Sequence, residues 1–203
     1  HQVSLTVSDA CGNLARKSVT ISGTAATRFA DMQKHWASTY TTPLNDKGII
    51  SGVTANGKTN FLPDQKITRG DFALMTANWL GLDLSRYAGV SLPYADAASI
   101  PKWDENAVKA LYAEGIMQGS KAGDGSLRAN AKASITRAEV AAVTCRLLER
   151  SADQTYIRSH IGELRTFADV TESHWAYWYA MEAANGHDYT KSGGSENWSR
   201  THR

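Results

Sequence analysis

Two short segments of this chain share one order of apolar and polar residues. The segment Ile67–Ala73 reads apolar, Thr, Arg, small, acidic, apolar, Ala, and Ile135–Ala141 repeats that order. Apolar residues then follow at helical spacing, at Phe72, Met75 and Trp79 in the first case and at Val140, Val143 and Leu147 in the second. This spacing predicts two helices, over about residues 69–81 and 137–150.

Each segment also carries the signature of a helix start. A Thr followed three residues later by Asp or Glu forms a capping box, in which the hydroxyl and the carboxylate each bond a backbone N–H of the first turn. The capping box leaves the arginine unexplained, because a cation just inside a helix start meets the positive end of the helix dipole. We therefore expect Arg69 and Arg137 to bind an anion. The alternative is a structural salt bridge to a nearby acid, for which the candidates are Asp31, Asp96 and Asp169.

A longer pattern surrounds these segments and occurs three times. It begins with aromatic-Ala-Asp and continues to a tryptophan, at Trp36, Trp103 and Trp175, which are 67 and 72 residues apart. A Gly-Ile-x-x-Gly element follows the first two tryptophans, at Gly48–Gly52 and Gly115–Gly119. Recurrence in a fixed order indicates one supersecondary unit used several times, each copy packing against its neighbour.

Each unit is expected to contain a first helix, a loop and a second helix. The first helices are predicted over roughly residues 35–47, 103–114 and 174–184. Gly48 and Gly115 are suited to left-handed caps at the ends of the first two of these helices. The third copy departs from the pattern, because no Thr-Arg segment follows its first helix in this sequence. We expect residues 184–203 to form an irregular closing segment instead.

The first residues of the chain have a different pattern. Residues 3–7 and 18–21 alternate apolar and polar, and Asp9–Asn13 between them has turn composition, which predicts a β-hairpin. An isolated hairpin is marginal in water, so we expect it to complete a sheet formed by residues upstream of His1. It resembles the last two strands of a bacterial Ig-like or PKD-type β-sandwich. Residues 23–27 have the composition of a linker.

Composition narrows the function classes. At 203 residues and 42% hydrophobic content, the chain can bury one sizeable core and a small appendage. The net charge of +2 gives no sequence-wide basic field for nucleic acid. No apolar run approaches the roughly 20 residues of a membrane span, and the N-terminus has no secretory-signal pattern, as expected of a fragment. Two cysteines, Cys11 and Cys145, do not make a disulfide framework.

No catalytic constellation is visible in the sequence. It holds no paired carboxylates, triad or phosphate loop at a credible spacing, so we expect neither enzymatic activity nor a cofactor. His35 and His174 each precede a Trp, but Lys102 takes their place in the second copy, so a helix-start role is expected rather than metal binding. No second ligand at metal spacing accompanies His187, and no metal site is predicted.

Taken together, the recurring elements resemble the S-layer homology repeat. They are Phe-x-Asp, His-Trp-Ala, Gly-Ile-Ile-x-Gly, Phe-x-Pro and Ile-Thr-Arg-Gly/Ala-Asp/Glu, and they cover about residues 28–190. The resemblance implies a mainly α fold, a pseudo-threefold module with a central helical bundle, here preceded by the short N-terminal β-hairpin. It divides the chain into the upstream hairpin at 1–22, a linker at 23–27, repeats at 28–92 and 93–165, and a partial third repeat with a tail at 166–203.

The resemblance also implies a function. Such modules are non-catalytic anchors that bind a secondary cell-wall polymer, in many members one with pyruvylated N-acetylmannosamine, and retain exported proteins on the bacterial surface. The implied partner is a cell-wall polysaccharide rather than nucleic acid or a membrane, and the implied location is extracellular, at the cell wall or S-layer. The alternatives are a structural or self-assembly module of a surface layer, and the anchor part of an exported enzyme whose catalytic region lies upstream.

The family's ligands bind in grooves between repeats. Carried onto this sequence, the implied ligand-binding residues are Trp36, Gly52, Arg69, Asp71, Trp103, Gly119, Arg137, Glu139 and Trp175. The two glycines would let the backbone approach the sugar, and the acids are expected to act more as caps than as direct ligands. We expect each Trp to be mostly buried, with one edge at a groove. Two competent grooves are expected, and a degraded third for which Lys191, Trp198 and Arg200 are candidates.

Overall fold

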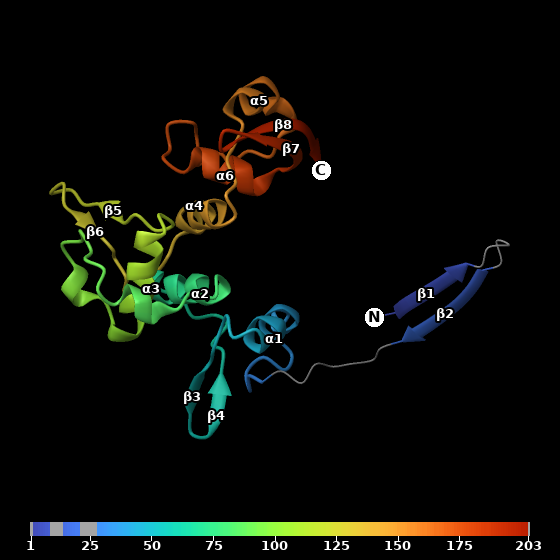
Figure 1. Cartoon of the computed structure of the whole chain (residues 1–203), viewed down its shortest axis with the longest axis horizontal. Helices are drawn as coiled ribbons and strands as arrows, with labels where there is room; N and C mark the ends of the chain where they lie inside the picture. Colours follow the sequence, from blue (N-terminus) through green and yellow to red (C-terminus); the bar gives the residue numbers. More distant parts are fainter. Residues whose placement is uncertain (1, 9–13, 21–27, 203) are drawn as a thin grey trace. The chain divides into compact units, whose positions relative to one another are not determined.

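The computed structural model describes residues 2–8, 14–20 and 28–202 of the chain. The chain forms two compact units, His1–Asp64 and Gln65–Arg203 (Figure 1). The boundary between the units lies inside the first expected repeat, so the repeat boundaries stay a prediction. No helix of the described residues has the length and apolar character needed to cross a membrane.

The first unit contains two hairpins and one helix. Strands β1 (Gln2–Ser8) and β2 (Leu14–Thr20) pair antiparallel, which confirms the predicted N-terminal hairpin; its turn and the expected linker lie outside the described residues. Helix α1 (Ser38–Asp46) starts three residues later than expected. Strands β3 (Val53–Ala55) and β4 (Lys58–Asn60) form a hairpin that we did not predict. Its turn is Asn56-Gly57, both with positive φ, as a tight two-residue hairpin requires.

The second unit begins with the two predicted Thr-Arg helices and the helix between them. Helix α2 (Arg69–Trp79) packs on α3 (Lys102–Ala113), and α4 (Arg137–Leu147) follows a short hairpin, β5 (Ser120–Lys121) with β6 (Leu127–Arg128). Short 3₁₀ turns connect these elements at Leu84–Tyr87 and Ala97–Ser99. The helices therefore agree with the sequence prediction to within a few residues, and the described part of the chain is mainly helical.

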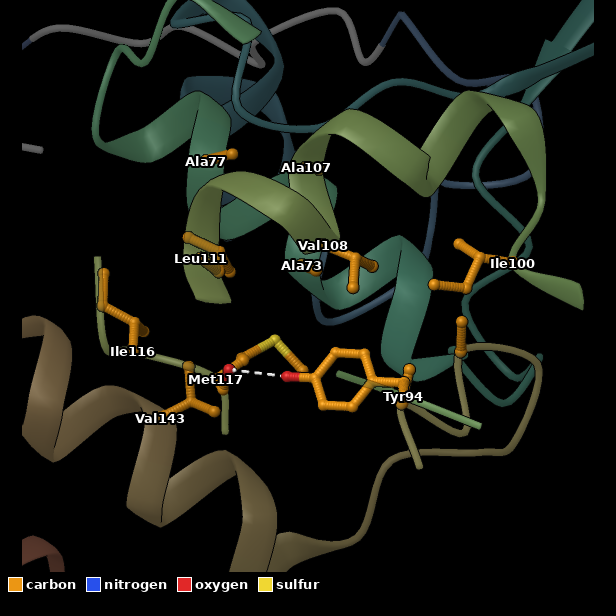
Figure 2. Close-up of a cluster of buried hydrophobic side chains, with 12 residues drawn as sticks. Ala73, Ala77, Tyr94, Ile100, Ala107, Val108, Leu111, Ile116, Met117 and Val143 are labelled. Carbon is orange, nitrogen blue, oxygen red and sulfur yellow. Dashed lines mark hydrogen bonds between the residues drawn. The ribbon is translucent and has the colours of Figure 1, made fainter. Parts of the chain in front are cut away.

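One apolar cluster joins α2, α3 and α4. Figure 2 shows Ala73 of α2 facing Val108 and Leu111 of α3, with Val143 of α4 entering from the other side. The small alanines let the helix axes approach closely. The hydroxyl of Tyr94 donates to the backbone oxygen of Met117 at 3.2 Å, so the polar end of this buried ring is satisfied.

The C-terminal part of the second unit has its own smaller core. Helices α5 (Gln154–Ser159) and α6 (Tyr177–Ala184), with a 3₁₀ turn at Ile161–Glu163, precede a hairpin of β7 (Gly186–Ser192) and β8 (Ser195–His202). The expected irregular closing segment is therefore wrong: it is a regular hairpin, placed after the first helix of its repeat as β5–β6 is. Trp198 packs in this core with Ile157 and Met181, so it does not line a third groove.

Two aspartates of the repeated aromatic-Ala-Asp element each clamp a later loop. The carboxylate of Asp31 accepts from the backbone N–H groups of Phe61 and Leu62 at 2.9 and 2.8 Å. In the second repeat the carboxylate of Asp96 accepts from Ala129 and Asn130, both at 2.8 Å. These two aspartates therefore fix the loop that precedes the second helix of their repeat.

The expected helix-start role of the histidines is confirmed. The backbone N–H of Ala37 donates to Nδ1 of His35 at 3.2 Å, and Ala176 donates to Nδ1 of His174 at 3.1 Å. Each ring thus satisfies one amide just before the first helix of its repeat.

The contact between α2 and α3 depends on a glycine. Asp104, the third residue of α3, is buried, and a Cβ added to Gly70 would overlap its carboxylate. The next pair of repeats has alanine at both positions, Ala138 on α4 and Ala176 before α6. The equivalent positions of the next junction therefore hold two small side chains in place of the Gly-Asp contact.

We predict that Gly70→Ala destabilises the chain by about 1–3 kcal/mol, because the added methyl overpacks the site. Adding Asp104→Ala should recover most of that loss, since the double variant recreates the Ala-Ala pair. Urea unfolding of both variants and of Asp104→Ala alone measures the coupling. Strictly additive losses would contradict the proposed contact.

We also predict a pH dependence that originates at Asp104. Burial, and to a smaller degree the nearby charge of Asp71, raise the pKa of Asp104 from 3.8 to about 6. The folded state therefore holds this proton more tightly than the unfolded state, and its contribution to the free energy of unfolding is lost as pH rises from about 4 through about 6. The difference in unfolding free energy between the wild type and Asp104→Asn, measured from pH 4 to 8, should change over this window. A constant difference would show that Asp104 does not titrate there.

Candidate functional site

The two Thr-Arg helices start in the same way. Thr68 accepts from the N–H of Asp71 at 3.0 Å and Thr136 accepts from that of Glu139 at 3.2 Å, while each acid returns a carboxylate oxygen to the Thr backbone. Both predicted capping boxes are therefore confirmed. The roles of Asp71 and Glu139 as caps are accounted for without a ligand.

The two arginines, in contrast, have different surroundings. Arg69 is only 6% exposed; its Nε donates to the backbone oxygen of Ala129 at 2.9 Å, and its Nη1 lies 2.5 Å from Oε1 of Glu139. The salt-bridge alternative is thus correct for Arg69, and its expected role as a ligand-binding residue is not supported. Its partner is the capping acid of the other segment rather than one of the three aspartates, because α2 packs directly against the second repeat.

Arg137 is exposed and has no ion pair or hydrogen bond of its side chain among residues 28–202. It lies at the edge of a groove of about 900 Å³ between the start of α4 and α6, which we call the α4–α6 groove. The groove is lined by Thr136, Arg137, Ala138, Ala141, Arg165, Thr166, Phe167, Asp169, Val170, His174, Ala176, Ala180, Ala183 and Ala184.

The lining of the α4–α6 groove suits an anion with apolar parts. Two arginines, Arg137 and Arg165, line it together with one acidic residue, Asp169, and the side chain of neither arginine is paired within the described part of the chain. Thr136, Arg137 and Ala138 at the start of α4 also line it, and a helix start favours negative charge. Alanines of α4 and α6 supply an apolar floor.

Sequence analysis did not identify Arg165. It lies outside the repeated elements, and the corresponding positions two residues before Phe29 and Tyr94 hold Thr27 and Leu92, so no repetition marks it. Its backbone is fixed by the buried amide of Asn185, which accepts from the N–H of Arg165 at 2.8 Å and donates to its carbonyl at 3.2 Å.

The three repeated tryptophans are exposed. Trp36, Trp103 and Trp175 show 77%, 70% and 58% of their surface, so the expectation that they are mostly buried is wrong. Core packing is done instead by the neighbouring residues, such as Ala176, which is fully buried beside Trp175. Trp175 lies between two residues that line the α4–α6 groove, whereas Trp36 belongs to the first unit.

Comparison with protein families matches residues 28–73 and 93–141 to the S-layer homology domain. The chain carries tandem S-layer homology domains. Both matches end within the first turns of α2 and α4, so the capped Thr-Arg starts belong to the family pattern. S-layer homology domains anchor surface proteins to the bacterial cell wall, and this region is an extracellular, non-catalytic anchoring module.

Curated relatives with similar regions are larger proteins. The chain is 30% identical over 148 residues to an amylopullulanase of Thermoanaerobacterium thermosulfurigenes, covering 73% of this chain and 7% of the relative. It is 30% identical over 149 residues to the exoglucanase XynX of Acetivibrio thermocellus, covering 73% of this chain and 12% of the relative. Cell surface glycoprotein 1 of Acetivibrio thermocellus is 28% identical over 173 residues, covering 81% of this chain and 7% of the relative. The chain thus spans only a small part of the length of these relatives.

The structure gives the second glycine of each Gly-Ile-x-x-Gly element in the S-layer homology domains a packing role. A Cβ on Gly52 would lie 2.7 Å from the ring of Phe29 and 2.6 Å from the backbone oxygen of Asn60. A Cβ on Gly119 would lie 2.5 Å from the ring of Tyr94 and 2.7 Å from the backbone oxygen of Arg128. The close approach that we attributed to a sugar is made by the chain's own aromatic rings.

We predict that replacing the two motif arginines has unequal effects on stability. Arg69→Met leaves Glu139 and the oxygen of Ala129 without their buried donor and should lower the free energy of unfolding by about 2–4 kcal/mol. Arg137→Met should change it by less than about 0.5 kcal/mol, because an exposed unpaired side chain is removed. Urea unfolding of the two variants measures this difference, and each variant is the control for the other. Equal losses of unfolding free energy would contradict the assignment of Arg69 as a buried ion-pair partner and Arg137 as an exposed, unpaired side chain.

Proposed function

We propose that the α4–α6 groove binds the carboxylate-bearing sugars of an acidic secondary cell-wall polymer and thereby retains an exported protein on the bacterial surface. The observation that carries this proposal is the contrast between the two motif arginines. Arg69 forms an ion pair with Glu139, whereas Arg137, at the same motif position, is unpaired among the described residues and lines a groove. The proposal thus has one arginine-based groove where the sequence suggested two.

Carboxylate chemistry fits the groove. A guanidinium offers paired N–H donors that match a carboxylate, and the first amides of α4 add donors from the same direction. A pyruvyl ketal combines such a carboxylate with a methyl group, which the floor of Ala138, Ala141 and Ala180 can accept. Arg165 then supplies a second cation for the same anion or for the next acidic sugar.

The exposed indoles are proposed as the sugar-stacking surfaces. An indole face is flat and apolar, as is the C–H face of a sugar ring. Trp175, flanked by lining residues, would extend the α4–α6 groove, and Trp36 and Trp103 would offer equivalent surfaces in the other repeats. Asp71 and Glu139 act as positioning residues through their caps.

For the whole protein, we propose an exported protein with this chain as its wall anchor. Its relatives include an amylopullulanase, an exoglucanase and an endo-1,4-beta-xylanase, and the matched region is a small share of each. An enzyme region elsewhere in the protein is consistent with those names. We further propose that the repeats follow pseudo-threefold symmetry, since α2 packs on α3 as α4 packs on α6.

Co-sedimentation with purified Gram-positive-type cell walls tests the proposed function. The chain should bind intact walls and lose binding when the non-peptidoglycan polymer is stripped or when its carboxyl groups are reduced to alcohols. Arg137→Ala should weaken binding by about tenfold or more, as expected for a charge-assisted pair, and Arg165→Ala should weaken it in the same direction.

Arg86→Ala is the matched control, because Arg86 is exposed but lies outside the groove. It should bind as the wild type does. Equal binding to stripped and intact walls would overturn the proposal. Concentration-dependent oligomers that form without polymer and are abolished by Arg137→Ala would assign the groove to a neighbouring chain instead.

A further inference from the structure

Three ionisable side chains converge where the β7–β8 hairpin meets α6. They are Glu182 of α6, His187 of β7 and Glu196 of β8, whose side chains are 4%, 1% and 0% exposed. One ligand atom from each lies within 4.8 Å of the others. Sequence analysis found no companion for His187, because only the folded hairpin brings the two carboxylates to it.

The geometry around His187 is that of a metal-binding imidazole. Its Nδ1 lies 2.6 Å from the backbone oxygen of Asn185, an acceptor, so Nδ1 carries a proton. Its Nε2 lies 3.1 Å from Oε2 of Glu196 and 3.6 Å from Oε1 of Glu182. In a tetrahedral zinc site with bonds of about 2.0 Å, two ligand atoms lie about 3.3 Å apart. The two separations at Nε2 fall on either side of that value. Ligating histidines commonly donate their other ring N–H to a carbonyl in this way.

The cluster has more acceptors than donors. Nη2 of Arg150 lies 2.7 Å from Nε2 of His187, 2.9 Å from Oε1 of Glu182 and 3.4 Å from Oε2 of Glu196, so its two N–H bonds face three acceptors. Oε2 of Glu182 is buried without any hydrogen-bond partner. Two carboxylates against one guanidinium leave a negative charge uncompensated when the imidazole is neutral.

The electrostatics of Glu182 agree with a deficit of positive charge. Burial raises the pKa of Glu182 and the nearby Glu196 raises it further, although His187 and Arg150 act in the opposite direction. An enclosed carboxylate in this situation is stabilised by any additional cation, whether a proton or a metal ion.

Arg150 occupies the centre of the cluster from a partly exposed position. Its side chain is 27% exposed, and its guanidinium stands 4.2 Å from the ring centre of Tyr189. Binding of a further cation at the position of Nη2 requires the guanidinium to give up its ion pairs with Oε1 of Glu196 at 2.6 Å and Oε1 of Glu182 at 2.9 Å and to move toward water, while α6 and the hairpin hold the three ligand atoms.

We propose that Glu182, His187 and Glu196 form a zinc-binding site that fastens the C-terminal hairpin to α6. The metal takes the position of Arg150 Nη2, and the unpartnered Oε2 of Glu182 provides a fourth donor. An imidazole with carboxylates suits zinc, whereas calcium and magnesium prefer oxygen ligands alone. None of the three ligands lines the α4–α6 groove, so the proposal is independent of wall binding.

Calorimetric titration of the EDTA-treated full chain with ZnCl₂ tests the site. We expect one zinc ion per chain with micromolar or tighter affinity. At about a hundredfold excess over Kd, the melting temperature should rise by about 5 °C or more. CaCl₂ and MgCl₂ should have no such effect.

Variants locate the bound ion. His187→Gln should weaken zinc binding by about tenfold or more, and Arg150→Gln, which removes the competing cation, should strengthen it. His202→Gln is the matched control: His202 pairs with Asp188 at 2.8 Å on the exposed face of the same hairpin, and its loss should leave zinc affinity unchanged.

The inference is overturned if the wild type takes up less than one equivalent of zinc at millimolar concentration. It is equally overturned if His187→Gln binds zinc as the wild type does. A melting temperature that responds to acid but not to zinc would assign the cluster to a proton and Arg150 alone. Since the wild-type titration needs no variant, a variant that fails to fold leaves the test intact.

Discussion

The second unit depends on one buried ion pair between two helix starts. Arg69 reaches from the start of α2 to Glu139, which at the same time caps the start of α4 through its other oxygen. One carboxylate therefore closes a helix and binds the neighbouring repeat. The backbone at the start of α2 also binds the second repeat, because the N–H groups of Arg69 and Gly70 donate to the carbonyl oxygens of Ala133 and Ala131, both at 2.9 Å. A polar seam thus accompanies an apolar cluster that combines small alanines with larger side chains such as Val108 and Leu111.

The proposed ligand site lies where this seam is not continued. Arg137 has the same motif, the same capping box and the same place at a helix start as Arg69. What differs is its surroundings, since within the described part of the chain its side chain has no ion pair or hydrogen bond, although Asp169 lines the same groove. At Arg69, the unfavourable position of a cation at a helix start is offset by an internal partner, Glu139. The guanidinium of Arg137 has no such partner among the described residues and remains available to an external anion.

Local signals in the sequence predicted much of the fold. Neighbouring residues determine the capping boxes, the helices α2, α3 and α4, and the hairpin of β1 and β2, so all of these were predictable from the sequence. The Asn56-Gly57 dipeptide is an equally local signal for a hairpin turn, but we did not predict the β3–β4 hairpin from it. The C-terminal hairpin was not, because Trp198 is buried through contacts with Ile157 and Met181 of other elements.

The site was less predictable because it depends on contacts between repeats. Repetition pointed to both arginines alike, but only the packing of α2 on the second repeat decides that Arg69 meets Glu139. Arg165 belongs to no repeated element and enters the groove through its link to Asn185. The tryptophans were expected to be buried because aromatic residues at a helix start usually anchor the helix, but Asp104 and Ala176, which follow Trp103 and Trp175, take the buried positions.

The pairing of Gly70 with Asp104 has a consequence for how such chains evolve. The two residues belong to different repeats but occupy one interface, where Ala138 and Ala176 serve the next junction. Unequal crossing-over, the usual source of tandem arrays, moves a whole repeat as a cassette and would separate the two halves of each junction. A shuffled array would set an alanine against the aspartate, so the packing of each junction depends on the linear order of the repeats.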